Sequence, residues 1–185
     1  MTLLDRWKLT YEDYLTFPDD RRRHKLINGE HFVTPAPIPR HQLAVHQLDL
    51  ALGKWLETDG SGVVFPSPID VVFDDTSVVQ PDLIWISEER RSIVTEKNVQ
   101  GALDLVIEIL LPTTCRTDEI IKRKLYECFG VREYWIVDAE LETVKVWRLE
   151  GERLVRAAEL SLEEEAVLTS PLLPGFSLPL RKLFA

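Results

Sequence analysis

The 185-residue chain has only two cysteines, and none of its hydrophobic runs approaches the length of a membrane span. Cys115 and Cys128 lack the paired spacing of a zinc site, which favours reduced thiols. A transmembrane helix needs about 20 apolar residues in a row, so no membrane association is expected. The first residues, Met1 to Trp7, also lack the basic-then-apolar order of a signal peptide. These absences predict a cytoplasmic protein.

Positive charge is scarce as well, because 22 lysines and arginines face 31 aspartates and glutamates, for a net charge of −9. General nucleic-acid clamps are usually basic, so the composition argues mildly against that class. It does not exclude a nucleic-acid enzyme, because acidic metal ligands contribute to the total. Basic clusters at 21–23 and 116–124 are interpreted as solvated faces.

Repeats and low-complexity segments are also missing, and the length predicts one domain over residues 1–185. Hydrophobic periodicity and turn residues predict the elements in chain order. They predict an α/β fold with a central mixed sheet, flanking helices, and hairpins near both ends. The elements are a short helix after Thr10, an Asn-Gly hairpin at 25–33, a helix at about 41–57, strands at 69–73, 78–86 and 103–111, a helix at about 117–129, a strand at 133–138, and a hairpin joining 143–149 to 153–159.

Two of the predicted strands each carry one acid within an apolar run, Asp82 in 78–86 and Glu108 in 103–111. Runs this short and this rich in branched residues are typical of buried strands. A buried carboxylate costs several kcal/mol unless a cation or strong donors hold it. The pair therefore suggests a divalent-metal site.

The predicted helix at 117–129 adds a cation to this pair. Its apolar stripe, which we expect to pack on the sheet, consists of Ile121, Leu125, Cys128 and Phe129. A polar stripe with a spacing of four flanks it and consists of Asp118, Lys122 and Tyr126. Lys122 would then lie at the edge of the sheet, where a lysine can orient or help deprotonate a metal-bound water. The alternative is a plain i,i+4 ion pair between Asp118 and Lys122.

The chain resembles the Uma-two family of restriction-endonuclease-like, PD-(D/E)XK-type proteins. The matching segments run through nearly the whole sequence. They are Leu-Thr-Tyr-Glu-Asp-Tyr-Leu (9–15), Leu-Ile-Asn-Gly-Glu (26–30), Pro-Arg-His-Gln (39–42), Val-Val-Gln-Pro-Asp-Leu (78–83), Asp-Leu-Val-Ile-Glu-Ile-Leu (104–110), the stripe Asp118, Lys122 and Tyr126, and Gly-Val-Arg-Glu-Tyr-Trp-Ile-Val-Asp (130–138).

This resemblance implies a restriction-endonuclease-like core that binds Mg²⁺ or Mn²⁺ and hydrolyses phosphodiester bonds of DNA. Asp82 and Glu108 would hold the metal. The superfamily's lysine position, two residues after the glutamate, is Leu110 here, so Lys122 would take that role. His41 and Tyr126 are expected to contact the substrate. A homodimer is expected by analogy with proteins that engage both strands of a duplex.

The sequence departs from the family pattern at two places. Lys25 stands where relatives carry a glutamate thought to join the site, and Leu111 stands where a serine is usual. A lysine in place of an acid would weaken metal binding. Glu30 shares a face with Lys25 in a two-residue Asn-Gly hairpin, which suggests Glu30 as a replacement metal ligand.

Three functions are compatible with these residues. The first is the metal-dependent nuclease. The second is a catalytically weakened relative that acts as a nucleic-acid-binding or protein-interaction module, which Lys25, Leu111 and the acidic net charge favour. The third is a metal-dependent hydrolase with another substrate, because a fold does not define a substrate.

Overall fold

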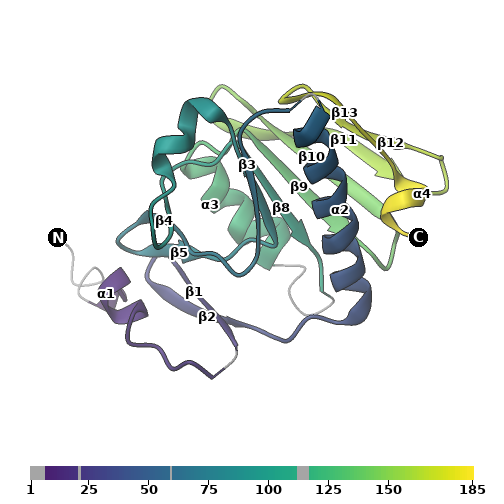
Figure 1. Ribbon diagram of the computed structural model, residues 1–185. Helices are drawn as coiled ribbons and strands as arrows, with labels where there is room; N and C mark the ends of the chain where they lie inside the picture. The colour runs from purple at the N-terminus through teal and green to yellow at the C-terminus, as the bar shows by residue number, and fades with distance from the viewer. Residues whose placement is uncertain (1–6, 21, 59, 112–116) are drawn as a thin grey trace.

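The computed structural model describes residues 7–20, 22–58, 60–111 and 117–185, and the strands in these ranges form three sheets (Figure 1). The largest sheet is built from β3 (Val63–Pro66), β6 (Leu83–Ile86), β8 (Leu105–Ile109), β9 (Glu133–Asp138), β10 (Thr143–Glu150) and β11 (Arg153–Ser161). Its spatial order is β11-β10-β9-β8-β6-β3. The β8–β9 pair is parallel and the other pairs are antiparallel, so the sheet is mixed.

The second sheet has the order β2-β1-β5-β4-β7, and the third pairs two strands near the C-terminus. These strands are β1 (Arg23–Ile27), β2 (Glu30–Thr34), β4 (Val71–Asp74), β5 (Ser77–Val79), β7 (Val99–Gln100), β12 (Val167–Ser170) and β13 (Leu173–Pro179). The helical segments are α1 (Tyr11–Tyr14), α2 (Pro39–Thr58), a 3₁₀ segment η2 (Glu88–Ile93), a π-helical segment η3 (Thr117–Lys122), α3 (Arg123–Cys128) and α4 (Leu180–Leu183).

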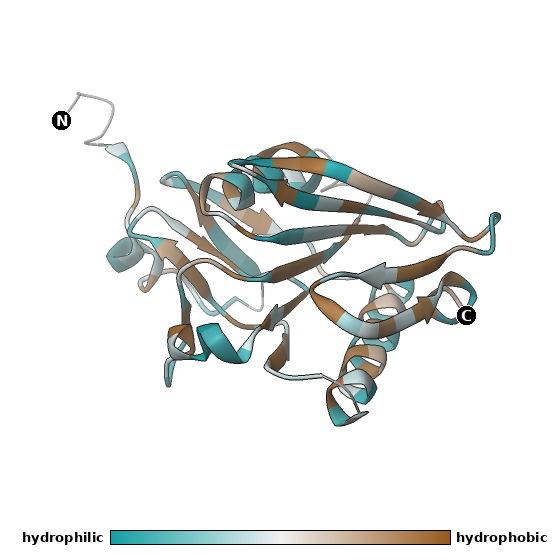
Figure 2. Cartoon of the chain, turned by 90° about the horizontal axis from the view of Figure 1, so that it is seen from above, coloured by the Kyte–Doolittle hydropathy of each residue, from teal (hydrophilic) through white to brown (hydrophobic). Residues whose placement is uncertain are grey.

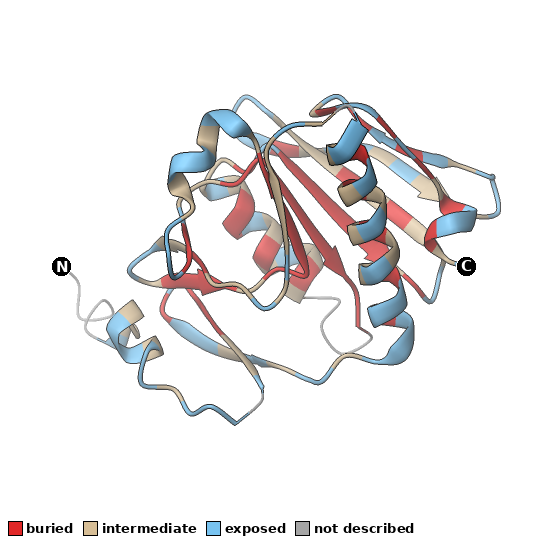
Figure 3. Ribbon diagram, in the orientation of Figure 1, coloured by how far each residue is buried: buried red, intermediate tan, exposed pale blue. Residues whose placement is uncertain are grey.

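Strand β8 divides the apolar interior into two clusters, because successive strand residues point to opposite faces of a sheet. Leu105, Ile107 and Ile109 pack with the buried side of α2. Val106 and Leu110 pack with residues of α3. Helix α2 accordingly covers the front of the sheet in Figure 1, and α3 lies behind it. Glu108 has the parity of Val106 and therefore faces α3. Figure 3 shows that the central strands are almost continuously buried.

Several predicted elements are confirmed. Asn28 and Gly29 turn the first hairpin with φ values of 52° and 79°, as a two-residue turn of this kind requires. Helix α2 covers the predicted helix at 41–57 and begins two residues earlier. Strands β8 and β9 are parallel, and the predicted helix at 117–129 lies between them in the chain as η3 and α3. Figure 2 shows apolar residues concentrated on the inner strands and polar residues at the outer turns.

The predicted strand at 78–86 is wrong as a single element. The structure divides it into β5 and β6, which belong to different sheets. Pro81 has no amide hydrogen and cannot donate to a ladder. The next residue, Asp82, instead accepts the amide of Ile109 with its side chain, at 2.9 Å. The break in the ladder is thus where the acid turns toward β8.

The predicted helix at 117–129 buries a different face from the one that we expected. Its more deeply buried stripe is the polar one, since Asp118, Lys122 and Tyr126 are all at most 4% exposed. Cys128, which we expected to be buried, is exposed. The polar side chains are buried because they form hydrogen bonds and ion pairs with Glu108 and with one another.

None of the helices in the described ranges is both long enough and apolar enough to span a membrane.

Candidate active site

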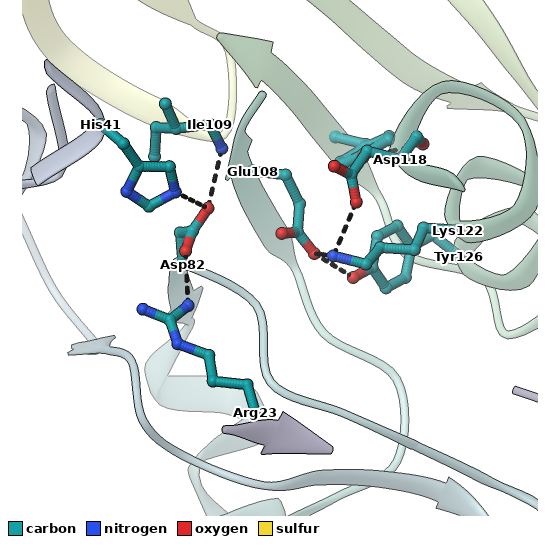
Figure 4. A network of polar contacts seen from close by, with 9 residues as sticks. Arg23, His41, Asp82, Glu108, Ile109, Asp118, Lys122 and Tyr126 are labelled. Atoms are coloured by element: carbon teal, nitrogen blue, oxygen red, sulfur yellow. Dashed lines mark hydrogen bonds and ion pairs between the residues drawn. The ribbon is translucent and has the colours of Figure 1, made fainter. Parts of the chain in front are cut away.

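Of the two acids singled out by the sequence, Glu108 lies in β8 and Asp82 immediately precedes β6, the adjacent strand. Strands β6 and β8 are antiparallel with Leu83 opposite Ile107. One step further along this register, Asp82 stands opposite Glu108, and residues that face each other across an antiparallel pair point to the same side of the sheet. Both side chains are buried, at 4% and 3% exposure. The fold brings the two carboxylates to one cavity, and Figure 4 shows Asp82 among Arg23, His41 and Ile109, with Glu108 beside Lys122 and Tyr126.

Asp82 is held by three donors from three different elements. Arg23 of β1 contacts Oδ1 at 2.8 Å, and His41 of α2 lies 3.1 Å from Oδ2 through its Nε2. The backbone amide of Ile109 donates to the same Oδ2. Burial alone would raise the pKa of Asp82, but the hydrogen bonds from His41 and Ile109 outweigh burial and lower it to about 2. Asp82 is accordingly an ionised group at neutral pH.

Glu108 has a different set of partners, supplied by the segment that follows β8. Lys122 Nζ lies 2.7 Å from Oε1, and the Tyr126 hydroxyl donates to the same oxygen at 2.7 Å. Among the described residues no hydrogen bond reaches Oε2. Burial raises the pKa of Glu108, and the charges of Asp118 and Asp82 act in the same direction, against Lys122. Two neighbouring carboxylates therefore have pKa values shifted in opposite directions, a feature common at catalytic sites.

Lys122 bridges two acids. In addition to Glu108 it contacts Asp118 Oδ1 at 2.8 Å, one helical turn earlier. Burial acts to lower the pKa of Lys122, but the two carboxylates outweigh burial and raise it above the usual value of 10.5. Lys122 is therefore a permanent cation and not a proton acceptor at neutral pH. The i,i+4 ion pair considered from the sequence exists, and it forms together with the contact to Glu108.

A second lysine enters the site from the hairpin. Lys25 of β1 is only 5% exposed and lines the same cavity as the acids. Burial lowers its pKa to about 8, with the charge of Lys122 acting in the same direction and Glu108 and Asp118 opposing. Among the ion pairs of the described residues, none involves Lys25. Lys25 is therefore a buried ammonium group that forms no ion pair of its own with the described carboxylates, because Glu108 and Asp118 are both in contact with Lys122.

The cavity between these groups has a volume of about 20 Å³, enough for about one water molecule. The extended segment that connects β2 to α2 forms part of its wall through Thr34, Pro35 and Pro37. Charges of both signs balance among the described residues of the remaining wall. Its three carboxylates belong to Asp82, Glu108 and Asp118, and its three cations to Arg23, Lys25 and Lys122.

The structure also shows the surroundings of three other predicted site residues. His41 and Tyr126, which were expected to contact substrate, are buried and bond to Asp82 and Glu108, and His41 also lines the cavity. They hold the acids in place because their polar atoms turn inward. Glu30 shares a face with Ile27 as predicted, but it is exposed and does not line the cavity. It lies four residues along β2 from Thr34, about 13 Å at strand spacing, too far to bind the same metal ion.

Arg23 lies in the cavity wall, although its basic cluster was expected to form a solvated face. Strand parity within the hairpin would have found it, because Arg23, Lys25 and Ile27 alternate onto one side of β1. Asp118 was recognised only as an ion-pair partner of Lys122. No pattern in the sequence indicates that its side chain lies in the cavity wall.

The mixed sheet, its flanking helices and the paired acids define a restriction-endonuclease-like protein. The chain belongs to the Uma2 family, whose model carries the description "Putative restriction endonuclease" and matches residues 11–181. The resemblance inferred from the motifs is thereby confirmed.

A solved structure shares this fold. It is the crystal structure of "a putative nuclease belonging to DUF820" from Anabaena variabilis, with a TM-score of 0.79 and 19% sequence identity. The similarity covers 95% of this chain and 97% of that chain. At this identity the likeness establishes the fold and nothing finer. A search of curated proteins finds no match.

Such a fold implies a divalent metal, and Asp82 and Glu108 are the carboxylates that would bind it. Glu108 Oε2 accepts no hydrogen bond from the described residues and Asp82 Oδ1 has a single donor, so each acid retains lone pairs for a metal. Within the described ranges, no group of three or more histidine, cysteine, aspartate and glutamate side chains is placed to share an ion. The residues thus fit a site with two carboxylates, water and a substrate oxygen, which is the set that Mg²⁺ prefers. They do not form an all-protein cage.

Proposed function

We propose that this protein is a metal-dependent nuclease that hydrolyses phosphodiester bonds of DNA. The observation that carries the proposal is the arrangement of Asp82 and Glu108 across β6 and β8, with Lys122 bound to Glu108. Two acids and one lysine that line the same cavity suit attack by water on a phosphodiester. Membership of the Uma2 family supports this choice.

The chain's own residues would act in distinct ways. Asp82 and Glu108 would hold Mg²⁺ or Mn²⁺, which supplies a Lewis acid and a bound water of lowered pKa. Arg23 and His41 keep Asp82 ionised and oriented. Lys122 fixes the rotamer of Glu108 and offsets negative charge that builds up on the phosphate. Because the pKa of Lys122 is raised, the lysine would act by its charge and not as the base.

The experiment is a cleavage assay on supercoiled and linear DNA with Mg²⁺ or Mn²⁺, with EDTA as the metal-free control. Glu108→Gln should lower the rate of cleavage by at least about 100-fold, the scale on which loss of a catalytic group acts. Glu57→Gln is the matched control, since Glu57 is exposed at the C-terminal end of α2. Equal cleavage by wild type and Glu108→Gln would show that the activity comes from a contaminant and would refute the proposal.

A second candidate is a DNA-binding module without catalysis. The balance of three carboxylates by three cations favours it, because the wall has no excess negative charge to attract a divalent ion. This candidate predicts that wild type and Glu108→Gln bind a DNA duplex equally in a mobility-shift assay. It also predicts that neither of them cleaves the duplex with either metal.

The proposal includes a homodimer, because a two-fold pair could present one site to each strand of a duplex. Sedimentation of the protein with and without duplex DNA tests this part. A monomer in both conditions would restrict the proposal to single-strand or single-site cleavage.

A further inference from the structure

Lys25 is an ammonium group that forms no ion pair among the described residues, although Glu108 and Asp118 act on it at longer range. It is 5% exposed, whereas the nearby acids are already engaged. Asp82 is bound by Arg23 and His41, and Lys122 occupies both Glu108 and Asp118. Burying a cation without a partner is costly, and an apolar side chain at this place would avoid that cost. Its neighbours on β1, Leu26 and Ile27, are buried apolar residues of this kind.

The surroundings of Lys25 indicate which kind of ligand could pair with its ammonium group. Its side chain lines the cavity together with Arg23 and Lys122, so three cations border one small space. The neighbouring ammonium of Lys122 helps to lower the pKa of Lys25. An oxyanion that entered the space would relieve the repulsion between the two ammonium groups and form a charge-assisted hydrogen bond.

The size of the cavity restricts how such an anion could bind. A volume of about 20 Å³ accommodates one oxygen-sized group but not a whole phosphate. A phosphodiester could therefore insert a single non-bridging oxygen, while its ester oxygens and sugars remain at the mouth beside Pro35 and Pro37. The backbone phosphate of an extended nucleic-acid strand projects its non-bridging oxygens in this way.

We propose that Lys25 is a phosphate-binding residue that receives a non-bridging oxygen of the phosphodiester and couples metal binding to substrate binding. The inference rests on the proposed function for its choice of substrate. Metal binding and phosphate binding would be coupled through the charges of the cavity. With Lys25 protonated, the described cations and carboxylates of the cavity wall are equal in number, so a divalent ion alone would add positive charge beside two lysines. A phosphate would reduce that excess, so each ligand should bind more tightly when the other is present.

The test measures binding, in EDTA, of a short fluorescently labelled DNA duplex to the wild-type protein, Lys25→Gln and Lys25→Arg. Lys25→Gln should bind at least tenfold more weakly, and its slope of log affinity against log salt should fall by about 0.9, the value for one phosphate contact. Lys25→Arg should retain most of the affinity. Lys124→Gln is the control, because Lys124 is exposed and lies outside this cavity.

A second measurement follows Mn²⁺ binding by electron paramagnetic resonance without DNA. Lys25→Gln should bind Mn²⁺ more tightly than wild type, because one positive charge has left the wall, and Lys124→Gln should not change. If Lys25→Gln does not fold, Lys25→Met removes the same charge with an apolar side chain. Wild-type DNA affinity and salt slope in a folded charge-neutral variant would overturn the inference. An absence of DNA binding by the wild type would also overturn it.

The binding assay and the cleavage assay can refute their two proposals independently of each other. Cleavage that depends on Glu108, combined with DNA binding that ignores Lys25, would refute this inference and leave the nuclease. Binding that depends on Lys25, with no cleavage by any variant, would refute the nuclease and leave Lys25 as a phosphate contact.

Discussion

Tyr126 donates its hydroxyl to Oε1 of Glu108 at 2.7 Å, and neither side chain is more than 3% exposed. The bond links α3 to β8 in the interior of the protein. The Tyr126 hydroxyl and Lys122 Nζ both contact Oε1 of Glu108. The other oxygen, Oε2, points toward the space beside Asp82 (Figure 4). Tyr126 thus holds one oxygen of the acid in place.

Tyr126→Phe should lower the free energy of unfolding by about 2 kcal/mol. Hydrogen bonds to charged groups contribute about 1.5–3 kcal/mol, and the change leaves the aromatic packing intact. Urea unfolding at neutral pH measures the effect. Tyr11→Phe is the control, because the Tyr11 hydroxyl accepts only a neutral donor, the Asn98 amide, in a part-buried setting. Equal losses in the two variants would argue against a special contribution from Glu108.

Lys25→Met should stabilise the protein at neutral pH. The folded-state pKa of Lys25 is about 8, below the ordinary value of 10.5. Between these values the unfolded chain binds more protons, so Lys25 makes wild-type stability rise with pH over that window. Below pH 8 the charged lysine lowers stability by up to about 3 kcal/mol, at about 1.4 kcal/mol per pKa unit.

The advantage of Lys25→Met over wild type should therefore be largest below pH 8 and shrink toward pH 10. The groups that face Lys25 are Lys122, Glu108 and Asp118. Denaturant unfolding at several pH values measures the difference. A difference that does not vary with pH would mean that Lys25 is not buried as a charge.

Asp82→Asn should destabilise the protein at neutral pH by about 2 kcal/mol. The folded-state pKa of Asp82 is about 2, below its ordinary value of 3.8. The stabilisation from its ionised form is present above pH 4 and is lost as the pH falls toward 2. The deficit of the variant should therefore vanish at low pH. Acid titration monitored by circular dichroism tests this, and a deficit that persists to pH 2 would contradict it.

Much of the fold follows from local pattern. The Asn28-Gly29 turn, helix α2 and strand β9 were predictable because backbone preference and hydrophobic periodicity act over a few residues. The strand at 78–86 was predicted wrongly for the same reason. Its apolar pattern is continuous, and only the side-chain bond from Asp82 to the amide of Ile109 shows where the ladder breaks.

The candidate site was predictable only in part. Asp82, Glu108 and Lys122 stood out because polar residues within apolar surroundings are costly and so informative. The inward-facing roles of His41 and Tyr126 were not visible, because an isolated polar residue on a helix gives no indication of its partner.

The amino-acid sequence by itself determined which segments are strands and helices, that two acids would be buried, and which family the chain belongs to. These properties depend on residue type and short-range order. Only the tertiary structure decided which cation meets which acid. Arg23 and His41 are 59 and 41 residues distant from Asp82 in the chain. They reach it because the hairpin, α2 and β6 converge at one edge of the sheet. The same convergence buries Lys25 among these groups without a partner of its own, since side-chain pairing depends on how sheets and helices pack.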